Sequence, residues 1–584
     1  MTTGRVIVVI LLSLLAAGVS CKPDSGGPFL KQGWTQDQRQ EFYHKSQGTR
    51  LIPLPWMLAL TQKGSAEPFL ADANIAKFRF IPDPKHKFNE YGLPVGFAVT
   101  PIPSMDDPTK MVPWVGWSCA ACHTGQIVAN GKTVQIDGAP SMQHNAAFVR
   151  AMLESLGETI SDDKKLEAFA KTALGIPAPG PQHKEGLKKK VLELIDKITL
   201  KPAIVQARTK CGDPAMKRKY ADPNFAPTPN WGFGRLDAIG RASNTVFAPM
   251  HPCNLDTADG QVSIPKIWNA WKYNWVQWNA FVENPLARNL AQALALGADP
   301  KTVDLTALGR LEDQVQTLQP PHWEDVFGPV ESKLAEEGKA LYHKGRPDRL
   351  VKGGLCAHCH VPESHLLKDC DGKAEWAVAM IPVNEIGTDE VTAVNYTTRL
   401  KKSAPNSGLP AQFQPAIAMA AITSKVIAER LEAQKVPEAD RKHLQRCRAN
   451  RWLNAKDNKD YEAYKAPTHE GVWATAPYLH NGSIPNLYLV LSPKEERDKQ
   501  AKTFCIGHDL AYDSANVGFT LTDQCPDLFK FDTTLRNNGN KGHEFRNAKD
   551  CEKREGPDAA QNGILGCELS DHERKAIVEY LKTL

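Results

Sequence analysis

The chain of 584 residues is 42% hydrophobic and 23% charged, and it carries a formal net charge of +5. This length suffices for two or more domains with buried cores. The small net charge argues against a nucleic-acid partner, because such partners select strongly basic surfaces. Beyond residue 20, no apolar run is long enough to cross a membrane.

Residues 1–20 have the features of a signal peptide. Arg5 precedes an apolar run over residues 6–19, which is too short for a transmembrane helix. Small residues then precede Cys21, so cleavage there leaves either a lipid-bearing N-terminal cysteine or a freely released protein. We therefore expect an extracytoplasmic protein, which is periplasmic, an outer-membrane lipoprotein attached to the membrane through lipid on Cys21, or secreted.

The first chemical motif is Cys119-Ala-Ala-Cys122-His123. Two thiols at this spacing form thioethers with the vinyl groups of one haem, and the following imidazole binds its iron. A zinc site would need a second pair of ligands, and a redox dithiol does not need an adjacent histidine. The motif therefore predicts a covalently attached c-type haem with His123 as the proximal ligand.

The segments after this motif have helical periodicity. Between residues 141 and 200, apolar residues such as Phe148, Met152 and Leu156 recur at helical spacing, and no comparable strand alternation appears. Residues 221–234 are rich in Pro, Gly and Asn, which predicts a long loop. We predict a mainly α fold with two cytochrome c-like haem domains, long loops and peripheral helices.

The most aromatic stretch of the chain contains Trp268, Trp271, Tyr273, Trp275 and Trp278. Such a cluster is typical of core packing between domains, but it also suits an electron bridge between haems or the wall of an apolar channel. Trp473 has the same alternative interpretations.

A Pro-rich joint at residues 318–322 marks the proposed domain boundary. The predicted organisation is a signal peptide over residues 1–20, an N-terminal arm over 21–69, a first haem domain over 70–320 and a second, C-terminal cytochrome c-like haem domain over 321–584.

The second haem motif is Cys356-Ala-His-Cys359-His360, which predicts a second covalent haem with His360 as the proximal ligand. His543 is the candidate for the opposite face of this haem, because it lies between the Asn/Gly-rich residues 537–542 and the last helix. The alternative is a surface loop histidine. No spacing singles out a sixth ligand for the first haem, for which the candidates are Met105, Met111, Met142, His144, Met152 and Met250.

The chain ends on a predicted helix. Ser570 and Glu573 form a capping box, and an apolar face follows with Ala576, Ile577, Tyr580, Leu581 and Leu584.

Eight further cysteines, an even number, predict disulfides in an oxidising compartment. Spacing favours two local pairs, Cys505 with Cys525 and Cys551 with Cys567.

Several segments resemble the dihaem cytochromes related to rubber oxygenase A, a group distantly similar to bacterial dihaem cytochrome c peroxidases. These segments are residues 91–97, 118–125, 234–240, 275–279, 471–483 and 542–545, and they occur in matching order across residues 70–584. The resemblance implies one haem that is open at its sixth position and reacts with dioxygen or peroxide, and one six-coordinate haem that relays electrons. It further implies that His543 is the distal ligand of the second haem. His480, in the strongest shared segment, then supports a haem propionate or the second haem pocket, or is a core histidine.

The leading hypothesis is a haem-dependent oxidoreductase, with catalytic side chains unassigned. A rubber-oxygenase-like enzyme would cleave an apolar isoprenoid with dioxygen and would need a long apolar channel. A peroxidase-like enzyme would reduce hydrogen peroxide with electrons from a small redox protein and would need a polar pocket. The alternative is a non-catalytic electron-transfer cytochrome with both haems six-coordinate, or a relative that has lost activity.

Overall fold

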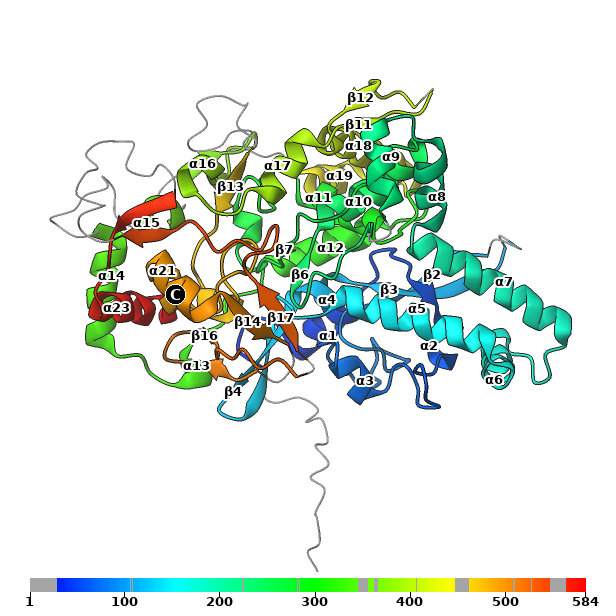
Figure 1. The fold of residues 1–584 in the computed structure, drawn as a ribbon, viewed down its shortest axis with the longest axis horizontal. Coiled ribbons are helices and arrows are strands. Elements are labelled where there is room, and N and C mark those ends of the chain that lie inside the picture. The colour runs from blue at the N-terminus through cyan, green and yellow to red at the C-terminus, as the bar shows by residue number, and fades with distance from the viewer. Residues whose placement is uncertain are drawn as a thin grey trace, which may run out of the picture.

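The computed structural model is predominantly helical and contains several small sheets (Figure 1). It describes residues 29–104, 107, 109–222, 225–280, 282, 284–344, 356–361, 366–405, 407–446, 462–507, 510–526, 528–546 and 563–584. The predicted signal peptide and Cys21 lie outside these ranges. Within them, no helix has the length and apolarity that a bilayer crossing requires.

The N-terminal part surrounds the first motif with both helices and strands. Helices α1 (Gln36–His44), α2 (Leu54–Ala59) and α3 (Asp72–Ala76) accompany an antiparallel sheet of order β1-β3-β2, made of β1 (Ile52–Pro53), β3 (Met111–Trp117) and β2 (Phe97–Pro103). The short helix α4 (Cys119–His123) follows, and then the hairpin of β4 (Thr124–Ala129) and β5 (Lys132–Asp137).

The sequence patterns did not predict these strands, because they are short and the apolar residues of β3 do not alternate with polar ones. In β3 only the last three residues are buried, so its burial is graded along the strand and does not follow a period of two. The mainly α expectation is therefore correct for the described residues taken together and incomplete around the first motif.

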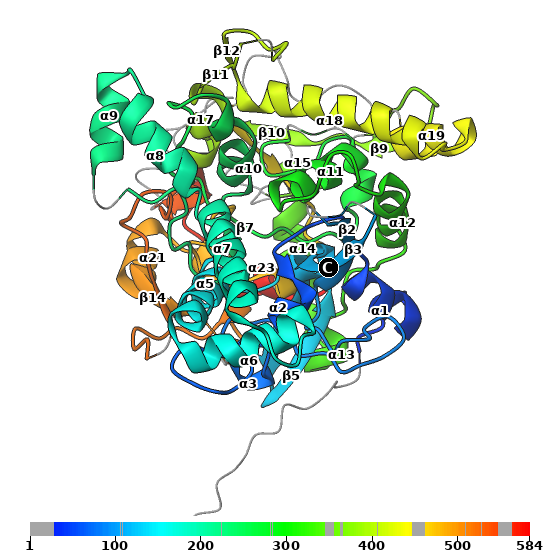
Figure 2. The same ribbon diagram turned by 90° about the vertical axis from the view of Figure 1, so that its right-hand side faces the viewer.

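The helices predicted between residues 141 and 200 are present as α5 (Asn145–Ser161), α6 (Asp163–Leu174) and α7 (Pro181–Ile198). They form the arm at the right of Figure 1 and face the viewer in Figure 2. Phe148, Met152 and Leu156 are fully buried and pack in one cluster with the sheet residues Phe97 and Trp117. The apolar face read from the sequence thus attaches this arm to the β1-β3-β2 sheet.

The middle of the chain adds a second helical layer, visible at the upper right of Figure 1. Its members are α8 (Lys201–Lys210), α9 (Pro214–Ala221), α10 (Ala238–Phe247), the 3-10 turn η1 (Ala248–Met250), α11 (Pro285–Ala295), α12 (Leu305–Val315), α17 (Val391–Thr398), α18 (Pro415–Ala433) and α19 (Glu438–Gln445). The same stretch of the chain also contains the 3-10 turn η2 (Ala270–Lys272). The two-residue strands β6 (Arg235–Leu236) and β7 (Val262–Ser263) pair beneath it.

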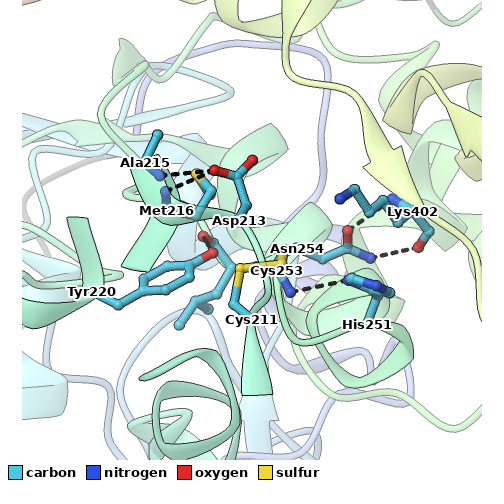
Figure 3. Close-up of a disulfide and its surroundings, with 10 residues drawn as sticks. Cys211, Asp213, Ala215, Met216, Tyr220, His251, Cys253, Asn254 and Lys402 are labelled. Atoms are coloured by element: carbon cyan, nitrogen blue, oxygen red, sulfur yellow. Dashed lines mark hydrogen bonds between the residues drawn. A yellow bond between two sulfur atoms is a disulfide. The ribbon is translucent and has the colours of Figure 1, made fainter. Parts of the chain in front are cut away.

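A disulfide between Cys211 and Cys253 ties the end of α8 to the segment after α10 (Figure 3). Asp213 accepts hydrogen bonds from the first turn of α9, and Asn254 exchanges backbone-directed hydrogen bonds with Lys402. Spacing alone did not indicate this pair, because 42 residues separate the two cysteines.

The predicted pair Cys505–Cys525 is confirmed. Cys370 and Cys567 are also disulfide-bonded, and Cys551 lies outside the described residues. Among the described cysteines, the four of the two haem motifs are the free ones.

The C-terminal part carries the second motif on α15 (Ala357–His360). Around it lie α13 (Glu324–Phe327), α14 (Ser332–Lys344), α16 (Val383–Ile386), η4 (Val472–Thr475), α20 (Leu487–Val490), α21 (Lys494–Ala501) and α23 (Asp571–Lys582). Two-stranded sheets join β8 (Leu366–Lys368) with β9 (Ala374–Trp376), β10 (Ala379–Pro382) with β13 (Ala463–Ala466), β11 (Lys401–Lys402) with β12 (Gln412–Phe413), β14 (Thr503–Ile506) with β17 (Phe529–Asp532), β15 (Tyr512–Asp513) with β16 (Gly518–Phe519), and β18 (Glu544–Arg546) with β19 (Ile564–Cys567).

The last helix, α23, has the predicted capping box of Ser570 and Glu573. It buries Ala576, Ile577 and Leu581, and the last two belong to the largest apolar cluster. That cluster also contains Trp268 and Trp473, so it takes residues from both sides of the joint at 318–322. The domain boundary at 318–322 stays a prediction, and the two halves share a core.

Helices α14 and α23 approach so closely at Gly338 that a side chain has no room. A Cβ atom there would lie 1.8 Å from the carbonyl oxygen of Ala576, which belongs to rigid helical backbone. We expect Gly338→Ala to lower the free energy of unfolding by about 1–3 kcal/mol, because the two helices must separate. Chemical denaturation of the haem-loaded protein measures this change.

The control is Gly186→Ala in α7, where an added Cβ meets nothing within 4 Å. This variant should be neutral or slightly more stable. Equal stability of the Gly338→Ala variant and the wild type would contradict the close packing of α14 on α23.

Candidate functional site

The first motif is held in place by backbone contacts with α1 and β2. Ser118 donates from its amide to the Gly96 carbonyl at 2.7 Å and from its hydroxyl to the Tyr43 carbonyl at 2.9 Å. Gly96 has φ +87°, and a Cβ there would lie 2.2 Å from the backbone of Ala121. Only glycine therefore allows β2 to approach the motif this closely.

The histidines of the two motifs, which are the predicted proximal ligands, are oriented in the same way. His123 Nδ1 donates to the carbonyl oxygen of Pro265 at 3.0 Å, and His360 Nδ1 donates to that of Pro467 at 2.6 Å. Because a carbonyl oxygen only accepts, each ring carries its proton on Nδ1 and leaves Nε2 free for a metal ion. Burial lowers the pKa of His123 to about 4 and also lowers the pKa of His360, so both rings are neutral, the form that binds iron.

The four motif cysteines are free thiols with shifted pKa values. Burial raises the pKa of Cys119 and Cys356 to about 12 and that of Cys122 and Cys359 to about 11. Thiols with such values are poor redox dithiols at neutral pH, because a redox dithiol needs a thiolate. The raised pKa values therefore argue against the dithiol interpretation.

One continuous cavity of ≈ 420 Å³ connects the two motifs. Its wall includes Cys119, Cys122 and His123 at one motif and Cys356, Cys359 and His360 at the other. Most of the remaining wall is apolar, which suits the porphyrin rings.

The wall between the motifs is built from residues 265–278 and 465–470. Trp268 Nε1 donates to the Glu470 carbonyl at 2.7 Å, and the Lys465 amide donates to the Trp278 carbonyl at 2.7 Å. The amide of Thr468 also donates to the hydroxyl of Tyr273. The two carbonyls that orient the proximal rings thus belong to two segments that are joined by hydrogen bonds.

Some of the aromatic residues singled out in the sequence line the cavity, and others pack in the core. Trp268, Tyr273 and Trp278 line the cavity, whereas Trp275 packs in a separate small cluster. Trp473 is fully buried in the largest core and donates to the Pro321 carbonyl at 3.1 Å. Trp268 belongs to that core as well, so it packs and lines the cavity at once.

His543 lies near the second motif, as predicted. Its ring centroid is 6.4 Å from that of His360, with the two planes 34° apart, and its buried Nδ1 has no partner among the described residues. Its backbone is left-handed (φ +50°), and at Gly542 before it an added Cβ would lie 2.5 Å from the Ile386 carbonyl. Burial and the nearby His360 lower the pKa of His543 to about 3.

Arg497, which sequence reasoning missed, fixes the loop that carries His543. Its fully buried guanidinium donates to the carbonyls of Gly542 at 2.7 Å, His543 at 2.6 Å and Asn540 at 3.2 Å. Its remaining hydrogen bonds go to the carbonyls of Leu489 and Val490 in α20 and of Ser492 after it, so Arg497 joins the end of α20 to the loop of His543. A single arginine in a charged helix carries no sequence signal for this role.

His469 was also missed. Its ring stacks on that of His360 with centroids 4.0 Å apart, and its Nδ1 lies 3.0 Å from the hydroxyl of Tyr342. His480 lines the same cavity, stacks on Tyr464 at 4.1 Å and leaves its buried Nε2 without a partner among the described residues. Its place beside the second motif agrees with a role in that pocket.

The candidates for a sixth ligand at the first motif lie elsewhere. Met111 is exposed, Met142 and Met152 pack in apolar cores, and His144 caps α5. Neither these residues nor Met250 line the cavity, and Met105 lies outside the described residues. In the part of the chain that the structure describes, the cavity wall contains no methionine, and its histidines besides His123 are His360, His469, His480 and His543.

Three cations face this apolar cavity: Lys266, Arg288 and Lys465. Arg288 pairs with Glu312 at 2.6 Å, and Lys266 donates to the Glu470 carbonyl. The ammonium of Lys465 lies 4.5 Å from the centre of the Tyr273 ring and has no hydrogen bond or ion pair among the described residues, and burial lowers the pKa of Lys465 to about 7. A buried amine without a carboxylate is costly, so Lys465 fits a ligand that brings carboxylates, as haem propionates do.

Comparison with known proteins agrees with this geometry. Residues 463–501 match the family model described as RoxA-like, cytochrome c-like. The match covers Pro467, His469, His480 and Arg497, which surround the second motif's proximal ring and its neighbour His543.

Two relatives come from Sinorhizobium fredii. The uncharacterized protein y4iJ is 31% identical over 95% of this chain and 93% of its own length. The uncharacterized protein y4iM is 26% identical over 55% of this chain and 64% of its own length. The chain therefore belongs to the same family as y4iJ and contains a RoxA-like, cytochrome c-like domain, which implies a haem protein with covalently bound c-type haem.

Proposed function

We propose that the protein is an exported dihaem c-type cytochrome that works as an oxidoreductase. Cys119, Cys122 and His123 hold a haem with an open position, while Cys356, Cys359, His360 and His543 hold a six-coordinate one. An open haem supplies redox chemistry with hydrogen peroxide or dioxygen, and a six-coordinate haem relays or tunes electrons. The observation that supports this proposal is the asymmetry of one cavity. Both motifs present an oriented imidazole, and among the described residues a second imidazole lies near the ring of His360 but not near that of His123.

The second site fits a bis-histidine arrangement. Two imidazoles bound to opposite faces of one metal ion, with bonds of about 2 Å, have centroids roughly 6 Å apart. The 6.4 Å between His360 and His543 supports this assignment. His469 lies closer to His360 than an opposing ligand would, so it shapes the pocket beside the proximal ring.

The first site has features for either oxidant. Arg288 and Asn289 both donate to Glu312 Oε2, and Glu312 Oε1 is buried without a partner among the described residues. This polar group lies in the cavity wall and suits hydrogen peroxide, with a small redox protein as electron donor. The apolar remainder of the wall suits an isoprenoid substrate cleaved with dioxygen.

Export rests on the signal-peptide features of residues 1–20 and agrees with the two disulfides Cys211–Cys253 and Cys505–Cys525. The periplasm, lipid attachment through Cys21 and secretion are the locations consistent with this proposal, and no nucleic acid is involved.

Optical and electron-paramagnetic-resonance spectra of the purified protein test the proposal. We expect one high-spin or ligand-accessible haem and one low-spin haem, with carbon monoxide binding to one haem per chain after reduction. His543→Ala should open the second haem, so carbon monoxide then binds to both. His572→Ala, at an exposed residue paired with Glu337, is the control and should leave both spectra unchanged. Two low-spin haems that refuse every ligand would favour the electron-transfer alternative.

Arg497 provides a test that leaves all haem ligands in place. Arg497→Lys removes the planar fork that contacts the Asn540, Gly542 and His543 carbonyls, so His543 should lose its fixed position. We expect a partial shift of the second haem from low-spin to high-spin, read by electron paramagnetic resonance, with the first haem unchanged. Lys499→Ala, exposed on the same helix α21, should not change either haem. A fully low-spin second haem in the Arg497→Lys variant would contradict this positioning role.

A further inference from the structure

A second cluster of metal-ligating side chains lies outside the haem cavity. His44 is the last residue of α1, and Asp83 and His86 belong to the loop between α3 and β2. One ligand atom from each residue lies within 4.8 Å of the other two. The side chains are largely enclosed, with 4%, 15% and 13% exposed, respectively. None of the three lines the cavity between the haem motifs.

Asp83 Oδ2 is the centre of this cluster. It lies 2.8 Å from His44 Nε2 and 3.0 Å from His86 Nε2. His44 Nδ1 lies 2.8 Å from the carbonyl oxygen of Phe97, which only accepts, so this nitrogen carries a proton. A neutral His44 would therefore turn the lone pair of Nε2 toward the carboxylate. A cation between the two atoms relieves that repulsion, and the Phe97 carbonyl gives the ring the outer hydrogen bond typical of a metal-bound histidine.

The spacing of the two rings fits a shared ion. Two imidazoles bound to a tetrahedral zinc ion with bonds of about 2.0–2.1 Å have centroids roughly 5 Å apart. The centroids of His44 and His86 are 5.4 Å apart, at an interplanar angle of 61°. On binding, His86 moves its proton to Nδ1 and gives up the 3.2 Å contact with the Phe88 amide.

The ligand set selects the metal. Two imidazole nitrogens and one carboxylate suit zinc, whereas calcium and magnesium favour oxygen ligands. We propose that His44, Asp83 and His86 form a Zn²⁺ site that leaves a fourth position for water.

Its place in the fold gives the site a structural role. Next to His44, the carbonyl of Tyr43 accepts from the Gly96 amide at 3.2 Å and from the Ser118 hydroxyl at 2.9 Å. Ser118 directly precedes Cys119 of the first haem motif. Zinc therefore joins α1 to the loop of Asp83 and stabilises their packing against β2, the strand that supports this motif.

The test uses the full exported protein with its haems attached. After treatment with a chelator, the protein is titrated with ZnCl₂ by calorimetry, and bound zinc is measured by mass spectrometry. We expect one zinc ion per chain and a higher midpoint of thermal unfolding with zinc. His86→Ala and Asp83→Asn should each weaken zinc binding by more than about 100-fold. His183→Ala, at an exposed residue of α7, should bind zinc like the wild type.

Asp83→Asn keeps an oxygen that accepts from His86, so it removes the charged ligand with little change to the fold. Its unchanged haem absorbance would show that lost zinc binding is not a folding failure. A wild-type protein that takes up no zinc, or zinc retained at wild-type affinity by both variants, would overturn the proposal.

Discussion

The site depends on two matching hydrogen bonds, from the imidazole of His123 to the carbonyl of Pro265 and from that of His360 to the carbonyl of Pro467. Each bond fixes the tautomer and the direction of one ring. The two carbonyls belong to segments that hydrogen-bond to each other through Trp268, Glu470, Lys465 and Trp278. A displacement of one proximal ring therefore acts on the backbone that orients the other.

The rest of the second pocket is also organised through the backbone, because the position of each side chain depends on hydrogen bonds that hold its backbone in place. Arg497 donates hydrogen bonds to backbone carbonyls and thereby fixes the position of the loop that contains Gly542 and His543. Gly96 and Gly542 allow backbone approaches that a Cβ would block. The cost of burying Arg497 is offset by its many hydrogen bonds, although burial still lowers its pKa to about 10.

Sequence reasoning was most successful where the chemistry is local. The helices around Phe148 and Leu187, the capping box at Ser570 and the Cys505–Cys525 disulfide each depend on residues close together in the chain. It failed where contacts span the chain. Three contacts arise only when distant segments meet. They are the Cys211–Cys253 disulfide, the stacking of His469 on His360 and the hydrogen bonds of Arg497 to residues 540–543. The prediction for His543 came from its position before the last helix together with the resemblance, and not from a periodicity, and the structure places its ring 6.4 Å from that of His360.

The largest core takes Trp268 from one side of residues 318–322 and Trp473 and Ile577 from the other. A polypeptide cut at this joint would expose both faces of that core to water, so neither half is expected to be soluble alone. The two halves consequently complete their folding together. If the chain is exported unfolded, the core of the N-terminal half stays open until residues near the C-terminus of the whole chain have emerged. During that time both haem motifs are accessible to accessory factors.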